Sequence, residues 1–303
     1  MKIIDSHSHL GDILYPDGGT LIWKKGLAMP AGIDIVSYNE AMLQRSFGLG
    51  EILYGMVKYW ATKVERARNA AATLENMSAS LDVNGISHAV CLPIAPNLTY
   101  DDLAMARRID GRILPFTSID YSLGLKAFEK LEQDIEDGAL GLKLHPIIQR
   151  KRLDDPLLLE ILHKFANFNK PVLTHAGLSY YYLGEENKVY HAENGGIDHV
   201  KELVSTFPKI KFIIGHAGLF QSYQVCKKLK EFDNIWVDTS FQSPENIRKL
   251  IEVFGAEKVM YGSDWPYGYC KPNIKAVKVA CRGDRALEEM LFYQNAATLL
   301  GVE

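Results

Sequence analysis

The stretch "ALGLKLHPIIQRKRLDDPLLLEILHKFANFNKPVLTH", residues 139–175, contains the pattern that decides the fold. It opens with a short apolar run at 139–145, continues into a segment with apolar residues at helical spacing at 156–168, and closes with a second apolar run at 171–175. Short apolar runs that alternate with helical segments are typical of parallel strands joined by crossover helices. The stretch therefore predicts a strand–helix–strand unit.

The same alternation extends along the chain in both directions. Six further apolar runs bring the expected number of strands to eight: 2–5, 87–93, 113–119, 211–216, 234–240 and 258–264. Further helical segments lie at 100–109, 124–137, 199–207, 222–232 and 244–255. An open doubly wound sheet usually carries a glycine-rich phosphate-binding turn after its first strand, and this chain has none there. We therefore expect an α/β fold, a closed (β/α)₈ TIM barrel.

Residues 10–85 interrupt this rhythm between the first two expected strands. The part at 10–32 is rich in glycine and proline and predicts an irregular loop, whereas the part at 37–84 has helical character. Loops that follow barrel strands open on the active-site end. We expect one domain over residues 1–303, with at least the first half of this insertion as a candidate lid or substrate wall, and an extended polar loop at 180–197.

The composition narrows the class of protein. Hydrophobic residues make up 47% of the chain, and the net charge of −3 gives no reason to expect a nucleic acid or an anionic membrane as partner. The four cysteines show no CxxC spacing, which favours reduced thiols over a disulfide framework or a thiolate zinc site. No secretory signal pattern or membrane-length apolar stretch is evident, so we expect a cytoplasmic protein with a small-molecule substrate.

Polar side chains gather at the C-terminal ends of the expected strands, where barrel enzymes carry their catalytic residues. His7 and His9 follow the first run and, two residues apart, point to the same side of a strand. The ends of later runs add Lys143, His145, His175, His216 and Asp264. Imidazoles with a carboxylate suit Zn²⁺ best, and they are compatible with Mn²⁺, Fe²⁺, Co²⁺ or Ni²⁺. The sequence therefore predicts a divalent metal site.

Six motifs at these positions occur in a fixed order: "DSHSHL" at 5–10, "GLKLHP" at 141–146, "LTHAG" at 173–177, "GHAG" at 215–218, "YGSDWP" at 261–266 and "NAATLLG" at 295–301. Over essentially the whole chain they resemble the amidohydrolase superfamily. The branch that they resemble most is that of the amidohydrolase-related (amidohydrolase 2 type) metal-dependent TIM-barrel hydrolases.

The resemblance implies a role for each matching residue. His7, His9, His175 and Asp264 match metal ligands, and the matching aspartate also takes a proton from metal-bound water. His216 matches a residue that is a second-metal ligand in binuclear members and a catalytic acid or base in mononuclear ones. Lys143 stands on the strand where binuclear members carry a carboxylated lysine that bridges two metals. The site is thus expected to hold one or two ions.

A divalent cation held by neutral imidazoles lowers the pKa of bound water to about 7. We therefore expect a metal-dependent hydrolase that cleaves a C–O or C–N bond of an amide, lactone or ester. One alternative is a non-oxidative decarboxylase of the aminocarboxymuconate-semialdehyde decarboxylase type, which an arginine aimed at the metal and an aromatic-lined pocket without a lysine bridge would favour. A non-enzymatic metal-binding barrel is a second alternative.

Three further residues are candidates for contacts with the substrate. His145 shares the inward face of its strand with Lys143, and His191 lies in the loop after the fifth strand. Arg45, in the insertion, could grip a carboxylate with both guanidinium nitrogens. Because dimers are common among relatives, a homodimer is one expected assembly.

Overall fold

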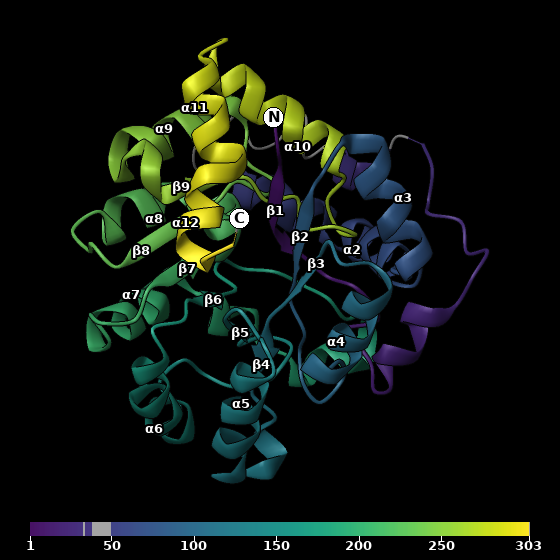
Figure 1. Ribbon diagram of the computed structural model, residues 1–303, viewed down its shortest axis with the longest axis vertical. Helices are drawn as coiled ribbons and strands as arrows, with labels where there is room; N and C mark the ends of the chain where they lie inside the picture. The colour runs from purple at the N-terminus through teal and green to yellow at the C-terminus, as the bar shows by residue number, and fades with distance from the viewer. Residues whose placement is uncertain (33, 38–49, 303) are drawn as a thin grey trace.

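Short parallel strands form the centre of the molecule, and helices surround them (Figure 1). The computed structural model of the chain describes residues 1–32, 34–37 and 50–302. The strands are β1 (Ile4–Ser8), β2 (His88–Cys91), β3 (Ile113–Pro115), β4 (Thr117–Ser118), β5 (Leu142–Leu144), β6 (Val172–Thr174), β7 (Phe212–Ile214), β8 (Ile235–Asp238) and β9 (Val259–Met260). Each expected run contains a strand, and the run at 113–119 is divided at Phe116 into β3 and β4.

Backbone hydrogen bonds close these strands into a barrel. Neighbouring strands pair in parallel in the orders β1-β2-β3 and β4-β5-β6-β7-β8-β9. The two sheets are joined at Phe116, whose N–H donates to the carbonyl of Cys91 at 3.0 Å. The last strand returns to the first through a parallel bridge between Ser8 and Trp265. The expected (β/α)₈ barrel is confirmed.

Helices cover the outside of the barrel, as the alternation predicted. They are α4 (Tyr100–Ile109), α5 (Lys126–Glu136), α6 (Pro156–Phe165), α7 (Ile197–Thr206), α8 (Ser222–Leu229), α9 (Pro244–Phe254) and α10 (Cys270–Cys281). The start of α9 shows why the sequence places it there: Ser243 accepts a hydrogen bond from the N–H of Asn246 at 3.2 Å, and proline occupies the first turn.

The inside of the barrel is apolar at one end. Its buried cluster includes Ile4, Leu173, Ile213 and Met260 from the strands, and it continues into Leu299 of the C-terminal helix α12 (Asn295–Leu300). The chain reaches α12 through α11 (Arg285–Glu289) and the π-helical turn η9 (Met290–Gln294). Because α12 contacts β1 and β9 and adds to this apolar cluster, it covers one end of the barrel (Figure 1).

In its described residues, the insertion after β1 holds a short 3-10 helix, η1 (Gly18–Trp23), and the helices α2 (Gly50–Asn69) and α3 (Leu74–Asn84). The helical segment expected at 37–84 is therefore interrupted, because Thr73 caps α3 by accepting a hydrogen bond from the N–H of Asn76 at 3.1 Å. Arg68, near the end of α2, is buried and bonds to Asp34 at 2.6 Å. It also donates to the carbonyl of Tyr267, in the loop after β9.

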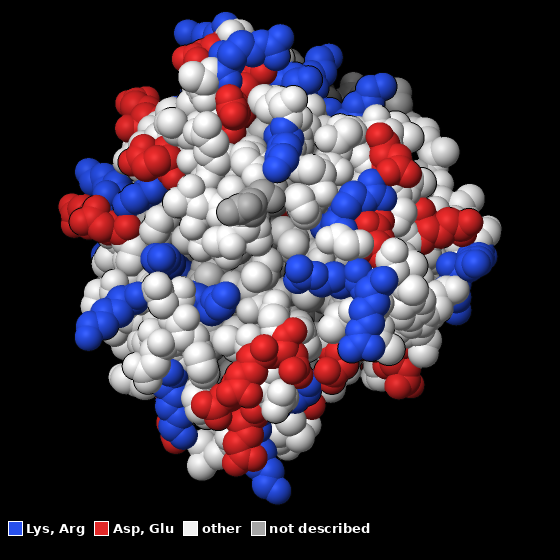
Figure 2. All heavy atoms as spheres, viewed as in Figure 1, with Lys and Arg blue, Asp and Glu red and all other residues white. Residues whose placement is uncertain are grey.

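Short 3-10 turns complete the chain: η3 (Tyr121–Leu123), η4 (Ala166–Phe168), η5 (Gly184–Val189), η6 (Ala192–Gly195), η7 (Gly215–Gln221) and η8 (Ala256–Lys258). The loop expected to be extended at 180–197 thus contains η5 and η6. Charged side chains of both signs are interspersed on the face shown in Figure 2. Among the described residues, no helix combines the length and the apolar character that crossing a bilayer requires.

Candidate metal centre

His7 and His9 point from the end of β1 to one place at the open end of the barrel, and both are buried. The Nδ1 atom of His9 donates to the carbonyl of Leu92 at 2.8 Å, and Nδ1 of His7 lies 2.8 Å from Oδ2 of Asp238. Each acceptor fixes the ring proton on Nδ1, so the Nε2 atoms present lone pairs. An imidazole that binds a metal through Nε2 needs this tautomer, with its proton on Nδ1.

Asp264 faces both of these lone pairs. Its Oδ1 atom lies 3.4 Å from Nε2 of His7 and 3.4 Å from Nε2 of His9. That oxygen is buried and has no hydrogen-bond partner. Two ligands about 2.1 Å from a metal, at a tetrahedral angle, lie about 3.4 Å apart. The spacing of the three atoms therefore fits a divalent cation between them, and they form one of two groups of side chains in the described part of the chain with metal-ligand spacing.

His175 follows β6 and is buried in the same group of rings. Its ring centre lies 5.2 Å from that of His216, which stacks on His7 at 4.4 Å. The Nε2 atom of His175 donates to the carbonyl of Gly177 at 3.1 Å, so Nδ1 carries the lone pair. The nearest polar group to Nδ1 among its described contacts is the hydroxyl of Tyr181, at 3.4 Å.

The charges at the site favour neutral imidazoles. Burial, reinforced by the Lys143 ammonium, lowers the pKa of His7 and of His9 well below the usual value for histidine. The same two causes lower the pKa of His175 to about 3. Burial raises the pKa of Asp264 well above its usual value, and Lys143 opposes this. Metal binding requires deprotonated ligands, and three of these four side chains already meet that requirement at neutral pH.

Lys143 lies on β5 next to the same ligands. It is fully buried, and its Nζ atom lies 3.4 Å from Nε2 of His7. Burial lowers its pKa to about 8, although the carboxylates of Asp264 and Asp238 raise it. Among the described residues no carboxylate forms an ion pair with it. The lysine lies beside the candidate ligands, and its carboxylation stays a prediction.

His216 is held in a strained turn after β7. Its φ angle is 56°, and positive φ angles continue to Leu219, with φ of 52°. Asp264 also has a positive φ, of 58°. Such conformations cost about 1–3 kcal/mol each in residues other than glycine, and they cluster at functional sites. The two residues expected to move protons are thus both held in left-handed backbone conformations.

Hydrogen bonds also orient the ring of His216. Its Nδ1 atom lies 2.8 Å from Oγ of Ser240, and the hydroxyl of Ser240 donates its single proton to Asp238. His216 must then donate from Nδ1, which leaves a lone pair on Nε2. Its Nδ1 also lies 3.8 Å from Oδ2 of Asp264.

Asp238 is a site residue that the sequence analysis did not single out. It ends β8 and accepts hydrogen bonds from His7 Nδ1, from the backbone N–H of His216 at 2.9 Å and from the N–H of Ser240 at 3.0 Å. The 2.8 Å spacing from His7 is that of a hydrogen bond, so Asp238 orients the ligand. The sequence did contain a signal for Asp238. It lies two residues after the apolar Trp236, so both residues point to the inward face of a strand that ends at the site.

Two glycines make room for His7. A Cβ atom on Gly262 would lie 3.1 Å from Cβ of His7 and 3.0 Å from Oδ1 of Asp238. A Cβ atom on Gly215 would lie 3.2 Å from Cε1 of His7 and 2.8 Å from the carbonyl oxygen of Thr174. Close packing against the candidate ligand His7 therefore explains why glycine occupies these positions in "YGSD" and "IGHAG".

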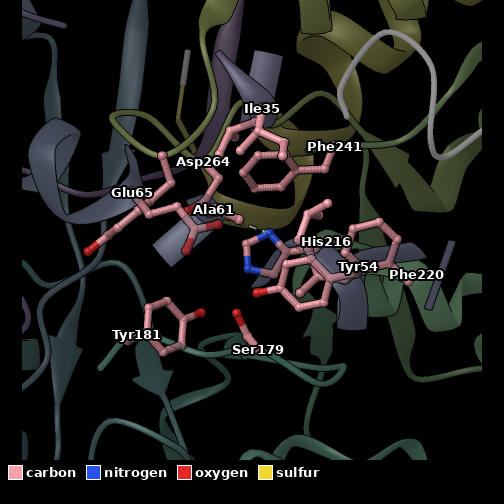
Figure 3. Close-up of a pocket in the computed structure, with 14 residues that line it drawn as sticks. Ile35, Tyr54, Ala61, Glu65, Ser179, Tyr181, His216, Phe220, Phe241 and Asp264 are labelled. Atoms are coloured by element: carbon pink, nitrogen blue, oxygen red, sulfur yellow. Dashed lines mark ion pairs between the residues drawn. The ribbon is translucent and has the colours of Figure 1, made fainter. Parts of the chain in front are cut away.

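A cavity opens beside Asp264 and His216 (Figure 3). The insertion supplies one of its walls through side chains of α2 and of the segment before it. The residues that line it are Ile35, Val36, Tyr54, Val57, Ala61, Glu65, Ser179, Tyr181, His216, Leu219, Phe220, Phe241, Asp264 and Tyr267. Most of this lining is apolar or aromatic, with polar groups at a few points.

The three candidate substrate contacts have different positions. His145 stacks on His175, with ring centres 4.3 Å apart, and its Nε2 lies 3.2 Å from the hydroxyl of Tyr181, which lines the cavity. His191 is exposed and lies 3.2 Å from Glu193, along a surface groove distinct from that cavity. Arg45 lies outside the described residues.

The family model for "Amidohydrolase" matches residues 4–302. The chain belongs to the amidohydrolase family. No curated protein matches this amidohydrolase chain.

Solved structures show the same fold. The 5-carboxyvanillate decarboxylase of Novosphingobium aromaticivorans, with manganese and 4-hydroxy-3-methoxy-5-nitrobenzoic acid, has 16% identity and a TM-score of 0.69, over 99% of this amidohydrolase chain and 96% of that one. The 2,6-dihydroxybenzoate decarboxylase of Rhizobium has 14% identity and a TM-score of 0.67, over 99% of both chains. A "probable 2-pyrone-4,6-dicarboxylic acid hydrolase" of Acinetobacter baumannii, with citric acid, has 16% identity and a TM-score of 0.60, over 99% of this chain and 100% of that one.

Proposed function

We propose that this amidohydrolase is a metal-dependent hydrolase of a small carbonyl compound, an amide, lactone or ester. The observation that carries the proposal is the buried Oδ1 atom of Asp264, which has no hydrogen-bond partner and lies 3.4 Å from the Nε2 atoms of His7 and His9. A buried carboxylate oxygen that faces two lone pairs is costly unless a cation lies between them.

The ligand atoms would be Nε2 of His7, Nε2 of His9 and Oδ1 of Asp264, which have metal-ligand spacing. His175 lies outside that group of three, so its Nδ1 atom would have to move closer to supply a fourth ligand. Three imidazoles and one carboxylate favour zinc, and manganese is the first alternative. When bound, a divalent ion lowers the pKa of a coordinated water and polarises a carbonyl oxygen.

His216 would move the proton in this reaction. Its free Nε2 accepts a proton from the attacking water and returns it to the leaving group. As that proton arrives, the positive charge on the ring is stabilised through Nδ1, which donates to Ser240, whose hydroxyl in turn donates to the Asp238 carboxylate. Asp264, whose Oδ2 atom lies 3.8 Å from Nδ1 of His216, would orient the water and take up its proton on the way to the ring.

Decarboxylation is the second candidate, and a specific feature favours it. The cavity wall carries Tyr54 and Phe220, stacked with ring centres 4.7 Å apart, and Phe241, so it suits a flat aromatic acid. Two of the similar folds are decarboxylases of aromatic acids. In that reaction a proton has to replace carbon dioxide, and His216 would first take one from water at Nε2 and then deliver it to the ring carbon.

Metal content and product analysis test both candidates. The purified chain is stripped with a chelator and reloaded with zinc or manganese. It is then assayed against carboxylic esters, lactones, anilides and aromatic carboxylic acids, with separate detection of released acid and of carbon dioxide. Metal-dependent release of acid supports hydrolysis, and release of carbon dioxide supports the second candidate.

The same experiment tests the ligands. The double variant His7→Ala/His9→Ala should retain no metal by elemental analysis, and a metal content equal to that of the unmodified chain would rule out this site. One ion per chain is expected with His216 as acid and base. Two ions per chain would instead support a carboxylated Lys143.

A further inference from the structure

Helix α2 brings a carboxyl group into the cavity beside Asp264. Glu65 lines the same cavity as Asp264 and Tyr181, although it comes from the insertion and they come from the loops after the strands (Figure 3). Its Oε2 atom is buried and has no hydrogen-bond partner. Arg68, one turn further along α2, is bound to Asp34 and to the carbonyl of Tyr267.

Such a group is costly unless something binds it. A buried polar atom without a partner costs about 1–3 kcal/mol, and nearly all such atoms in native proteins are paired. Burial raises the pKa of Glu65 to about 8, against the lowering effect of Arg68. At neutral pH the carboxyl group is therefore uncharged and offers both an O–H donor and a carbonyl acceptor.

The surroundings of Glu65 suit an apolar body. Ala61 and Val57, one and two turns before it on α2, line the same cavity, and so do Ile35 and Phe220. Binding cavities typically combine apolar walls with a few polar groups that fix the orientation of the ligand. Here Asp264 and Glu65 are carboxyl groups contributed by different parts of the chain.

We propose that Glu65 determines substrate specificity by hydrogen bonding to a neutral hydroxyl or N–H group carried by an apolar substrate. This inference rests on the proposed function, because Asp264 marks the end of the cavity where the reacting carbonyl lies. Two anchoring points fix both the position and the direction of the substrate, which a metal ion alone does not.

Binding of small metal-chelating probes tests this role without turnover. The zinc-loaded chain is titrated by calorimetry with benzohydroxamic acid, whose two oxygens chelate divalent metals, and with its 2-, 3- and 4-hydroxy derivatives. At least one hydroxy derivative should bind about tenfold more tightly than the parent, the value of one neutral hydrogen bond.

Variants at position 65 then assign the preference. Glu65→Leu should bring the hydroxy derivatives to within about twofold of the parent compound, whereas Glu65→Gln, which keeps a donor and an acceptor, should retain the preference. Glu132→Leu makes the same chemical change on an exposed face of α5 and should leave all four affinities unchanged. The role of Glu65 is overturned if Glu65→Leu discriminates as the unmodified chain does, or if the unmodified chain does not discriminate.

A failure of the metal site gives a different result. If benzohydroxamic acid shows no zinc-dependent binding to the unmodified chain, the proposed function is overturned. Thermal unfolding then still tests whether Glu65 is kept for binding. A carboxyl group kept for binding costs stability, so Glu65→Leu should raise the Tm, and a Tm at or below that of the unmodified chain overturns the role.

Discussion

The Nδ1 atom of His7 and the Oδ2 atom of Asp238 lie 2.8 Å apart in the barrel interior and join the first strand of the chain to β8. This bond fixes the direction of the His7 lone pair at Nε2. The same carboxylate also binds the backbone of His216, so one acidic side chain orients both a candidate ligand and a candidate catalytic group. Outer groups of this kind are important for affinity in metal sites.

Replacing Asp238 with asparagine should weaken zinc binding about 10- to 100-fold. An asparagine has one acceptor oxygen where the carboxylate receives hydrogen bonds from His7, His216 and Ser240. Competition with a chromogenic chelator measures the change. Asp233→Asn, which is exposed just before β8, is the matched control and should bind zinc normally. Equal zinc affinities for the two variants would show that Asp238 does not support the metal site.

Replacing Asp264 with asparagine should separate metal binding from turnover. The amide oxygen still offers one ligand atom, but the side chain can no longer act as a carboxylate toward a proton. We expect much of the zinc to be retained and the rate to fall about 10²- to 10⁴-fold, the range that general acid–base groups contribute. Elemental analysis and the substrate assay are run on the same sample. A rate close to that of the unmodified chain would contradict the proton-handling role.

Replacing Gly262 with alanine should disturb the site without removing any polar group. The added Cβ would lie 3.0 Å from Oδ1 of Asp238 and 3.1 Å from Cβ of His7, so those side chains must move. Overpacking of this kind costs about 1–3 kcal/mol. We expect lower stability in chemical denaturation and weaker zinc binding.

Gly55→Ala is the control for that change. Gly55 lies inside α2 and a Cβ there would meet nothing within 4 Å. Alanine is preferred over glycine in a helix by about 0.5–1 kcal/mol, so this variant should be slightly more stable, with unchanged zinc affinity. If Gly262→Ala matches Gly55→Ala in both measurements, the close packing around His7 is not required.

The fold could be predicted from the sequence because its signals are local and repeated. Each apolar run is short and each helix begins at a recognisable residue, as Ser243 does at α9. The helical break before Leu74 was missed because residues 61–85 have helical character throughout. It depends on Thr73, whose hydroxyl can cap a helix but is equally common inside one.

The candidate site could be predicted in part. His7, His9, His175, His216 and Asp264 follow directly from the ends of strands, and the structure brings their side chains together. Glu65 could not be found in this way, because its place beside Asp264 depends on how α2 lies over the barrel. That placement results from tertiary contacts such as the one between Arg68 and the carbonyl of Tyr267.

The stability of the chain should depend on pH through Glu65. Its pKa is about 8 in the folded chain and 4.5 ordinarily. Between these values the unfolded chain has released the proton while the folded chain keeps it, so stability falls as pH rises from about 4.5 to about 8. Glu65→Leu lacks this titration, and its advantage over the unmodified chain should therefore grow across that range.

Urea unfolding of both proteins at pH 5, 6, 7 and 8 measures that advantage. We expect it to grow by about 1–3 kcal/mol, less than the full 1.4 kcal/mol per pH unit because the side chain is partly exposed. The matched variant Glu132→Leu removes a carboxyl group from an exposed position on α5 and serves as the control at each pH. A constant or shrinking advantage for Glu65→Leu would mean that Glu65 is ionised in the folded chain, and it would then act only as a hydrogen-bond acceptor.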